Sequence, residues 1–265
     1  MTLLTRACAS VGRVLARMWG IGRSLAIYHG QPGRHGRLRR FYGQFLCPGD
    51  LGFDVGAHVG NRVRAWRSLG ARVVAIEPQP DFVRVLQILF GRDPEVAVLA
   101  KAVGAHCGRE ALRIATATPT VSSLSPAWVG TVAADRRFGG VHWDRTVEVE
   151  VVTLDSLIAA YGRTAFCKID VEGFEAEVLS GLSRPVAALS FEYLPQAHDA
   201  GLAVLAQVER LGASAGGYAY NYSPVETMRF AADAWLDAAG LERLLGRIRP
   251  QGHSGDVYAR LKSPE

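Results

Sequence analysis

The sequence predicts an α/β fold, a doubly wound domain around a mostly parallel sheet. From Leu51 onward, short apolar segments typical of strands alternate with helical patterns, as expected for a sheet with helices on both faces. Three of these strands end in a carboxylate, namely Asp54, Glu77 and Asp170. Because the carboxyl ends of parallel strands meet at one edge of a sheet, we expect the three acids to line a single ligand site.

The expected core strands are short runs rich in β-branched and aromatic residues. They are Leu51 to Val55, Arg72 to Ile76, Val96 to Ala100, Phe166 to Asp170, Ala187 to Glu192, Gly217 to Asn221 and Asp256 to Leu261. We expect the intervening helices to begin near Asn61, Asp81, Leu154 and Phe174. Between the third and fourth core strands, Glu110 to Ala115 and Thr146 to Leu154 predict an inserted strand pair. The segment Thr116 to Arg145 joins them at the ligand edge, where insertions often shape a substrate pocket.

Length and composition fit one large domain with additions, or at most two domains. The chain has 265 residues, of which 49% are hydrophobic and 21% charged, so it can bury a full core. The four cysteines, Cys8, Cys47, Cys107 and Cys167, show no spacing typical of a metal site or of a disulfide framework. This usage suits a reducing compartment, and we expect a cytoplasmic protein.

Residues 1–48 are expected to form a basic helical extension, followed by the main domain over residues 49–265. Residues 1–49 contain eight arginines and no Asp or Glu. Apolar residues recur there at helical spacing, which predicts an amphipathic helix. They are Leu4, Ala7, Val11, Val14, Met18, Ile21 and Leu25. Arginines interrupt this apolar run, which argues against a membrane span and a secretory signal.

Two interpretations of the basic helix stay open. Its charge suits peripheral attachment to an anionic membrane, or to an acidic partner, through residues 1–45. The alternative, which we favour from the sequence alone, is a helix packed on the core with its arginines in water.

The segment from Phe53 to Gly60 reads Phe-Asp-Val-Gly-Ala-His-Val-Gly. A dinucleotide fingerprint needs Gly-x-Gly-x-x-Gly, but here Asp54 takes the place of the first glycine and the last glycine comes one residue late, which disfavours NAD. A carboxylate at this turn suits a cofactor with a cationic amino-acid end and no phosphate, such as S-adenosylmethionine. Glu77, 21 residues beyond Gly56, could accept both hydroxyls of a ribose. The alternative is that Asp54 and Glu77 only cap helices.

These residues resemble the FkbM-type methyltransferases, a branch of the S-adenosylmethionine-dependent class I enzymes. The resemblance covers about Gly49 to Tyr193 and is most specific in Lys168-Ile169-Asp170-Val171-Glu172-Gly173-Phe174-Glu175. It also rests on Phe53 to Gly60, Ile76-Glu77-Pro78, Ala102-Val103-Gly104 and Val121-Ser122-Ser123, with weaker similarity at Asn221 and Ser254 to Tyr258. It implies the seven-stranded, Rossmann-like sheet of class I methyltransferases and S-adenosylmethionine as cofactor.

The resemblance also implies a set of cofactor-binding residues. Asp54, Gly56 and Ala57 would hold the methionine part, Glu77 the ribose, and Ala102 with Val103 would flank the adenine. His58, Gly60 and Pro78 lie in the same motifs and complete the expected set. Family members commonly have Asn where this chain has His58, so the role of that side chain is open.

Methyl transfer to a hydroxyl requires a group that removes or shares the acceptor proton. Asp170 and Glu172 follow the fourth core strand and Glu192 ends the fifth, so we expect these three residues at the reacting centre, with Asp170 as the first choice of base. Alternatively, Glu172 and Glu175 stabilise the dipole of the next helix. The loop residues His106, His142 and His198 are alternative bases. Lys168 is expected to pair with a carboxylate and to have no catalytic role.

The expected activity is O-methylation of a hydroxyl on a saccharide, a glycolipid or a secondary metabolite, as the family resemblance implies. N-methylation of a small amine is one alternative, and a non-catalytic cofactor-binding module docked through its basic N-terminus is another. No motif for a flipped nucleic-acid base is present, so nucleic acid is not expected as a partner. No zinc motif is present either, and no metal site is predicted, although a carboxylate-bound divalent cation near Asp170 stays open.

Overall fold

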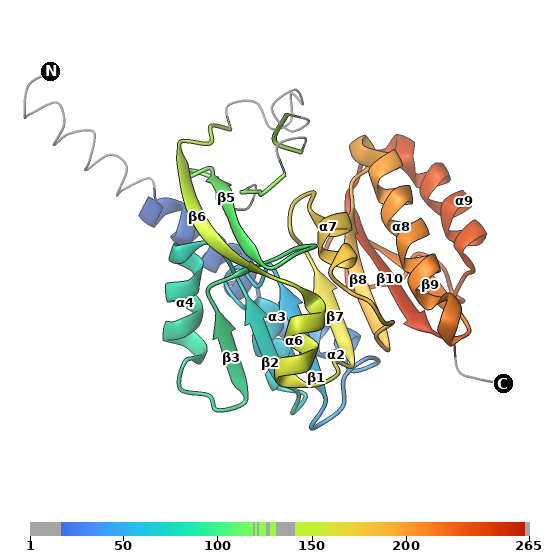
Figure 1. Ribbon diagram of the computed structural model, residues 1–265, viewed down its shortest axis with the longest axis horizontal. Coiled ribbons are helices and arrows are strands. Elements are labelled where there is room, and N and C mark those ends of the chain that lie inside the picture. The colour runs from blue at the N-terminus through green and yellow to red at the C-terminus, as the bar shows by residue number, and fades with distance from the viewer. Residues whose placement is uncertain (1–16, 119, 121, 126–127, 131–140, 263–265) are drawn as a thin grey trace, which may run out of the picture.

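Seven strands form one twisted sheet in the computed structural model, which describes residues 17–118, 120, 122–125, 128–130 and 141–262 (Figure 1). The strand order is β3-β2-β1-β7-β8-β10-β9, and β10 runs antiparallel to both of its neighbours. The strands are β1 (Leu51–Val55), β2 (Arg72–Ile76), β3 (Val96–Leu99), β7 (Phe166–Ile169), β8 (Ala188–Tyr193), β9 (Tyr218–Pro224) and β10 (Gly255–Leu261). The chain reverses direction across the sheet between β1 and β7, which places a ligand crevice at their carboxyl ends. The predicted doubly wound α/β fold is confirmed.

Helices cover both faces of the sheet (Figure 1). Three of them contribute buried side chains to the core on one face, namely α2 (Arg34–Tyr42), α3 (Asn61–Arg67) and α4 (Pro80–Phe90). The opposite face is covered by α6 (Leu154–Tyr161), α7 (Glu175–Ser180), α8 (His198–Gly212) and α9 (Ala238–Ile248). The helices expected near Asn61, Asp81, Leu154 and Phe174 are present within a residue of those positions, whereas α8 and α9 are additional to the expected elements.

The predicted strand pair is present as part of a second, three-stranded sheet. Its strands are β4 (Ala102–Val103), β5 (Gly108–Ile114) and β6 (Arg145–Val152), in the order β4-β6-β5. β5 and β6 are antiparallel, as expected for the pair. β6 ends two residues earlier than predicted because the side chain of Thr153 accepts the backbone N–H of Ser156 and so caps α6.

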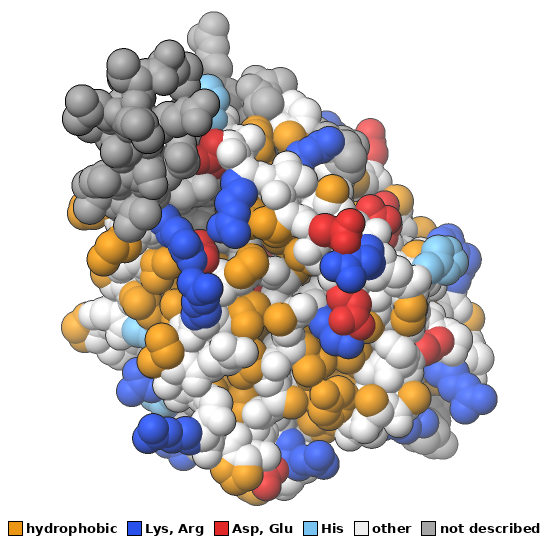
Figure 2. All heavy atoms as spheres, turned by 60° about the vertical axis from the view of Figure 1, so that its left-hand side comes forward, with side chains coloured by type: hydrophobic (Ala, Val, Ile, Leu, Met, Phe, Trp, Pro, Cys, Tyr) orange, Lys and Arg blue, Asp and Glu red, His pale blue; other side chains and the backbone are white. Residues whose placement is uncertain are grey.

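The described part of the basic N-terminal segment, from Arg17 onward, packs on the main domain. Residues 17–29 are helical, and α2 follows with Leu38, Phe41 and Tyr42 buried in the same core cluster as Trp66. Leu4, Ala7, Val11 and Val14 of the predicted helix lie outside the described residues. The side of the molecule that carries α4 comes forward in Figure 2, where hydrophobic side chains lie among Lys and Arg side chains. Within the described part of the chain, we find no helix with the length and apolar character needed to span a bilayer.

Candidate active site

The turn after β1 brings the ends of three strands together. Gly56 has a φ of 83°, and a Cβ atom on it would collide with the carbonyl oxygen of Asp170 at the end of β7. The backbone N–H groups of Gly56 and Ala57 donate to the carbonyl oxygen of Ile76 at the end of β2, at 2.9 and 3.1 Å. Glycine therefore allows the closest approach of β1 to the loop after β7, and the turn fixes β2 beside them.

A cavity lies at this edge, between the strand ends and the inserted sheet. It brings together eight of the residues predicted from the sequence: Gly56, His58, Glu77, Pro78, Ala102, Val103, Asp170 and Glu172. Phe82 of α4 and Ser123 of the insertion also line it. The other predicted residues, Asp54, Ala57, Gly60 and Glu192, lie outside this lining.

Glu77 is held rigidly at the wall of the cavity. Its Oε2 accepts the backbone N–H of His58 and its Oε1 accepts the backbone N–H of Gln79, both at 2.8 Å. The residue is only 5% exposed, and burial raises the pKa of its carboxyl to about 7, against the opposing effect of the two backbone hydrogen bonds. The two N–H groups fix the orientation of the carboxylate at the cavity wall, and each oxygen keeps a further lone pair for a ligand.

His58 packs between aromatic rings at the same wall. Its imidazole lies edge-on to Phe82, with ring centroids 4.0 Å apart, and to Tyr28, at 5.1 Å. Burial lowers the pKa of His58 to about 3, so the ring is neutral at physiological pH. Its Nε2 atom is buried and has no hydrogen-bond partner among the described residues. A neutral imidazole of this kind offers an unused polar atom next to the cavity.

Asp54 and Gly60 lie in the layer behind the cavity wall. Asp54 is 1% exposed, and its Oδ2 has no hydrogen-bond partner within the described part of the chain. Burial raises its pKa to about 6, although Arg62 and Lys168 act in the opposite direction. Gly60 precedes α3 with a φ of 75°, and a Cβ atom there would strike Phe90 and Leu86 of α4. Its geometry serves the packing of α3 against α4.

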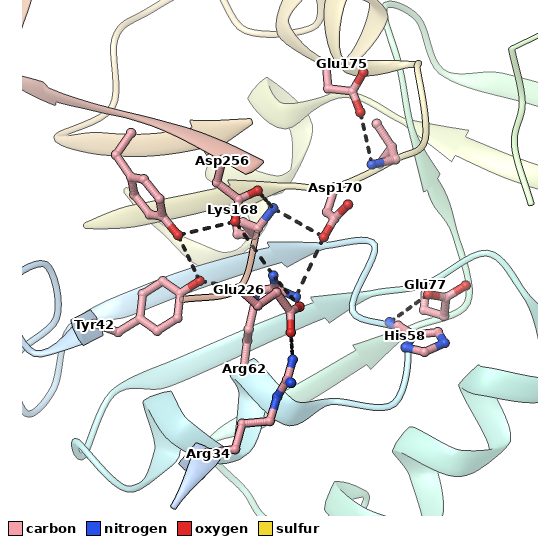
Figure 3. Close-up of polar contacts among 12 residues, drawn as sticks. Arg34, Tyr42, His58, Arg62, Glu77, Lys168, Asp170, Glu175, Glu226 and Asp256 are labelled. Carbon is pink, nitrogen blue, oxygen red and sulfur yellow. Dashed lines mark hydrogen bonds and ion pairs between the residues drawn. The ribbon is translucent and has the colours of Figure 1, made fainter. Parts of the chain in front are cut away.

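A network of charged groups links Lys168 of β7, Asp256 of β10 and Arg62 of α3 to Asp170 (Figure 3). Lys168 is fully buried, and its Nζ lies 2.9 Å from Oδ1 of Asp256 and 3.3 Å from Oδ2 of Asp170. The expected pairing of Lys168 with a carboxylate is thus confirmed. The guanidinium of Arg62 on α3 lies 3.7 Å from Asp170 and 3.5 Å from Glu226. Glu226 also pairs with Arg34 of α2.

Asp170 is the ionised member of an acidic group. Burial alone would raise its pKa, but Lys168 and Arg62 together hold that pKa below the ordinary value. Asp170, Glu172 and Glu192 each place one carboxylate oxygen within 4.8 Å of the others, which is also the donor set that a divalent cation uses. Burial, followed by the charges of neighbouring acids, raises the pKa of both Glu172 and Glu192 well above the ordinary value.

A second cavity adjoins the first at these carboxylates. Tyr28, Arg62, Asp170 and Glu172 line both cavities. Glu192 lines the second cavity, and its Oε2 is buried with no hydrogen-bond partner among the described residues. The carboxylates therefore stand where two separate ligands could meet.

The insertion closes over the loop that carries Glu172. Ser123 donates from its Oγ to the backbone carbonyl of Glu172 at 2.6 Å. Gly173 has a φ of 83°, and a Cβ atom on it would collide with the indole of Trp128. Glu172 itself has a φ of 54°, which is uncommon for a residue with a side chain. The insertion thus holds the carboxylate loop in its conformation.

Glu175 stabilises the same loop from the first turn of α7. Its Oε1 accepts the backbone N–H groups of Val171 and Gly173, at 3.3 and 3.2 Å. Burial is the main cause that raises its pKa, to about 7. This geometry agrees with the structural role expected for Glu175 rather than with catalysis.

Tyr28 and Arg62 are site residues that the sequence analysis did not single out. Arg62 precedes Ala65 and Trp66 by three and four residues and is buried as they are, so an arginine on an apolar helix face was the available signal. Tyr28 continues the predicted periodicity of Ile21 and Leu25. The alternative bases His106, His142 and His198 do not line either cavity.

Comparison with known proteins gives one family match. A family model described as the methyltransferase FkbM domain matches residues 54–230. No curated protein matches the chain.

Similar solved structures share little sequence with the chain. A precorrin-6y C5,15-methyltransferase from Geobacter metallireducens has 10% identity and a TM-score of 0.45, covering 85% of this chain and 87% of its own. A SAM-dependent methyltransferase from Geobacter sulfurreducens in complex with S-adenosyl-L-homocysteine has 11% identity and a TM-score of 0.42, with coverages of 88% and 92%. Magnesium protoporphyrin IX methyltransferase from Synechocystis with bound SAM has 12% identity and a TM-score of 0.39, with coverages of 91% and 84%.

Proposed function

Because the chain belongs to the FkbM methyltransferase family, we propose that it transfers a methyl group from S-adenosylmethionine to a hydroxyl of a saccharide, a glycolipid or a secondary metabolite. The observation that carries this proposal is the position of Asp170, Glu172 and Glu192 where the two cavities meet. One cavity holds the methyl donor and the other the acceptor, so the carboxylates stand beside the reacting atoms.

The lining of the first cavity suits S-adenosylmethionine. When bound, this cofactor supplies an electrophilic methyl group on a positively charged sulfur. Three acidic residues, Glu77, Asp170 and Glu172, line the cavity beside the basic Arg62 and Lys101, and the buried Asp54 lies outside the lining. The ionised carboxylate of Asp170, and that of Glu77 above about pH 7, favour a cationic ligand. Gly56 has no side chain, so bare backbone lines the cavity at this turn.

We assign the predicted cofactor residues to parts of this ligand. The carboxylate of Glu77 accepts the ribose hydroxyls, since the two backbone N–H groups already orient it. Gly56 and Ala57 form the turn beside the methionine part, with Asp54 contributing negative charge from behind. Ala102 and Val103 provide an apolar wall for the adenine, next to Pro78. The orphaned Nε2 of His58 accepts or donates a hydrogen bond at the same wall.

Asp170 is the proposed proton acceptor. Methyl transfer is an in-line displacement, so the acceptor oxygen must lie opposite the sulfur and lose or share its proton. Asp170 lines both cavities and is ionised because Lys168 and Arg62 stabilise its negative charge. Glu172 and Glu192, whose pKa values are raised, hydrogen-bond further hydroxyls of the acceptor. A polyhydroxylated acceptor uses all three groups.

The described residues of the insertion line the donor cavity and none of them lines the second cavity, so the insertion acts on the acceptor through the loop of Glu172 that it holds. Four residues of the segment Thr116 to Arg145 line the first cavity, namely Thr120, Ser122, Ser123 and Leu124. Trp128 of the same segment packs on the loop of Glu172.

The exposed free cysteines Cys47 and Cys107 suit a reducing compartment, so we place the enzyme in the cytoplasm.

A methyl-transfer assay with isotope-labelled S-adenosylmethionine tests the proposal. We expect label in saccharides or other polyols and none in matched amines of similar size, or in nucleic acid. Label in the amines alone would replace O-methylation by N-methylation. Binding of the cofactor without transfer to any acceptor would favour a non-catalytic module and overturn the proposed activity.

A further inference from the structure

The helix of residues 17–29 has two different faces. Gly20 and Ser24 are buried and Tyr28 is partly buried, and these residues follow one another every fourth position on the side toward the protein. The stripes at positions 18, 22, 26 and 19, 23, 27 point the opposite way, and every residue in them is exposed. One face therefore packs on the domain while the other faces outward.

Specific contacts hold the inner face in place. Arg17 pairs with Asp81 at the start of α4. The Nε2 of His29 lies 2.8 Å from the carbonyl oxygen of Val59, and the ring of Tyr28 meets His58. These contacts agree with the interpretation favoured from the sequence, in which the helix packs on the core.

The outer face is apolar, which packing on the core does not explain. Trp19 is 72% exposed, Met18 65% and Ile27 38%. Met18 was expected on the apolar face of the helix, which the favoured interpretation packs on the core. Arg23 is the exposed charged residue between Trp19 and Ile27 on the same stripe. Large apolar side chains gathered on one exposed helix face mark a surface that binds another phase or molecule.

Charge indicates the kind of partner. Residues 1–49 contain eight arginines and no acidic residue, and Arg37, Arg39 and Arg40 of α2 are exposed as well. Apolar side chains interspersed with arginines suit the interface of an anionic lipid bilayer, where the arginines meet headgroups and the apolar groups enter the acyl boundary.

We propose that the outer face of helix 17–29, defined by Met18, Trp19, Arg23 and Ile27, docks the enzyme on an anionic lipid bilayer. The helix lies in the plane of the interface, as its outward apolar face requires. Trp19 sits at the headgroup level, the position that indole prefers because it has an apolar body and a polar N–H group. Tyr28, on the other side of the same helix, stays at the two cavities.

Vesicle co-sedimentation of the full chain tests the proposal. We expect binding to phosphatidylcholine vesicles that contain phosphatidylglycerol, weaker binding at high salt, and little binding to pure phosphatidylcholine. The double variant Met18→Ser, Trp19→Ser should bind at least about tenfold more weakly, because two exposed apolar side chains no longer enter the interface. Arg23→Glu should weaken binding through charge. Thermal unfolding should stay unchanged in both variants, since these side chains are exposed.

Matched variants locate the contact. Ile88 on α4 is 83% exposed but lies outside the docking face, so Ile88→Ser should bind vesicles as the original chain does. Trp19→Phe should keep binding while losing most of the blue shift in tryptophan fluorescence that vesicles induce. If Ile88→Ser and the double variant lost vesicle binding equally, the assignment of the lipid contact to helix 17–29 would be overturned. Absence of vesicle binding, or dimerisation that the double variant abolishes, would overturn the lipid as partner.

Discussion

Glu77 connects protonation with cofactor binding at the scale of single residues. Both of its oxygens accept backbone N–H groups, and burial raises its pKa to about 7. A ribose hydroxyl donates a stronger hydrogen bond to the ionised carboxylate than to the neutral acid. In the proposed site, cofactor affinity therefore depends on ionisation of this one side chain.

Affinity for S-adenosylhomocysteine should rise with pH through about 7 and level off above it. Below pH 7 the empty site holds a proton that ribose binding must displace, so affinity should fall by up to about tenfold per pH unit. Calorimetric titrations between mildly acidic and mildly basic pH measure the affinity for S-adenosylhomocysteine at each pH. Glu77→Gln should bind weakly at every pH with a flat profile, and a sloping profile in that variant would assign the dependence to another group.

Asp170→Asn should lower turnover by about 10²- to 10⁴-fold, as expected for removal of a general base, and should leave affinity for S-adenosylhomocysteine nearly unchanged. Lys168 keeps Asp256 as a partner and Arg62 keeps Glu226. Single-turnover rates and calorimetry measure the two effects.

Asp256→Asn serves as the matched control, because Asp256 is the other carboxylate paired with Lys168. Asp256→Asn should lower the unfolding temperature about as much as Asp170→Asn does, but it should keep more of the turnover. Equal turnover in the Asp170 and Asp256 variants would mean that Asp170 acts through the ion-pair network alone.

Residue patterns predicted the acids of the site better than their partners. Glu77 and Asp170 could be identified because each follows an apolar strand, and Asp54 because it lies near the end of one, since parallel strands align their ends. Arg62 and Tyr28 come from helices whose distance to the strand ends depends on tertiary packing. Glu192 was predicted at the reacting centre, and the register that pairs it with Asp256 places it at the second cavity.

At the scale of elements, the turn between β1 and α3 is the part of the site most sensitive to added volume. Gly56→Ala should destabilise the protein by about 2 kcal/mol or more, because the new methyl group meets the carbonyl of Asp170 and the φ of 83° strains a residue with a side chain. Urea unfolding measures the change in the free energy of unfolding.

The matched control is Gly246 in α9, where a Cβ atom would meet nothing within 4 Å. Gly246→Ala should stabilise the protein by about 0.5–1 kcal/mol, since alanine favours the helix. Equal effects at Gly56 and Gly246 would contradict the close contact between β1 and the loop after β7.

Strands and their connecting helices could be predicted where the apolar pattern is strong. The helix α9 had an available signal, because Leu241, Leu244 and Leu245 recur at helical spacing after the capping residue Asp237. The two-residue strand β4 had none, because its pairing with β6 depends on a segment about fifty residues later.

At the scale of the whole molecule, the sheet order makes the site. β1 and β7 are separated by about a hundred residues yet pair side by side, which places Gly56 against Asp170. The inserted sheet covers this junction from one side and helix 17–29 reaches it from the other through Tyr28. The sequence could predict the sheet, but the closing elements depend on contacts between distant segments.

The most direct test of the site is calorimetric titration with S-adenosylhomocysteine, with NADH beside it, for the original chain, Glu77→Ala and Glu175→Gln. Glu175 is the matched control, a buried glutamate of similar pKa that accepts two backbone N–H groups but does not line the cavity. We predict that the original chain and Glu175→Gln bind S-adenosylhomocysteine equally and do not bind NADH, and that Glu77→Ala loses about 1–3 kcal/mol of binding free energy. Unchanged affinity in Glu77→Ala, or binding of NADH, would contradict the cofactor site described above.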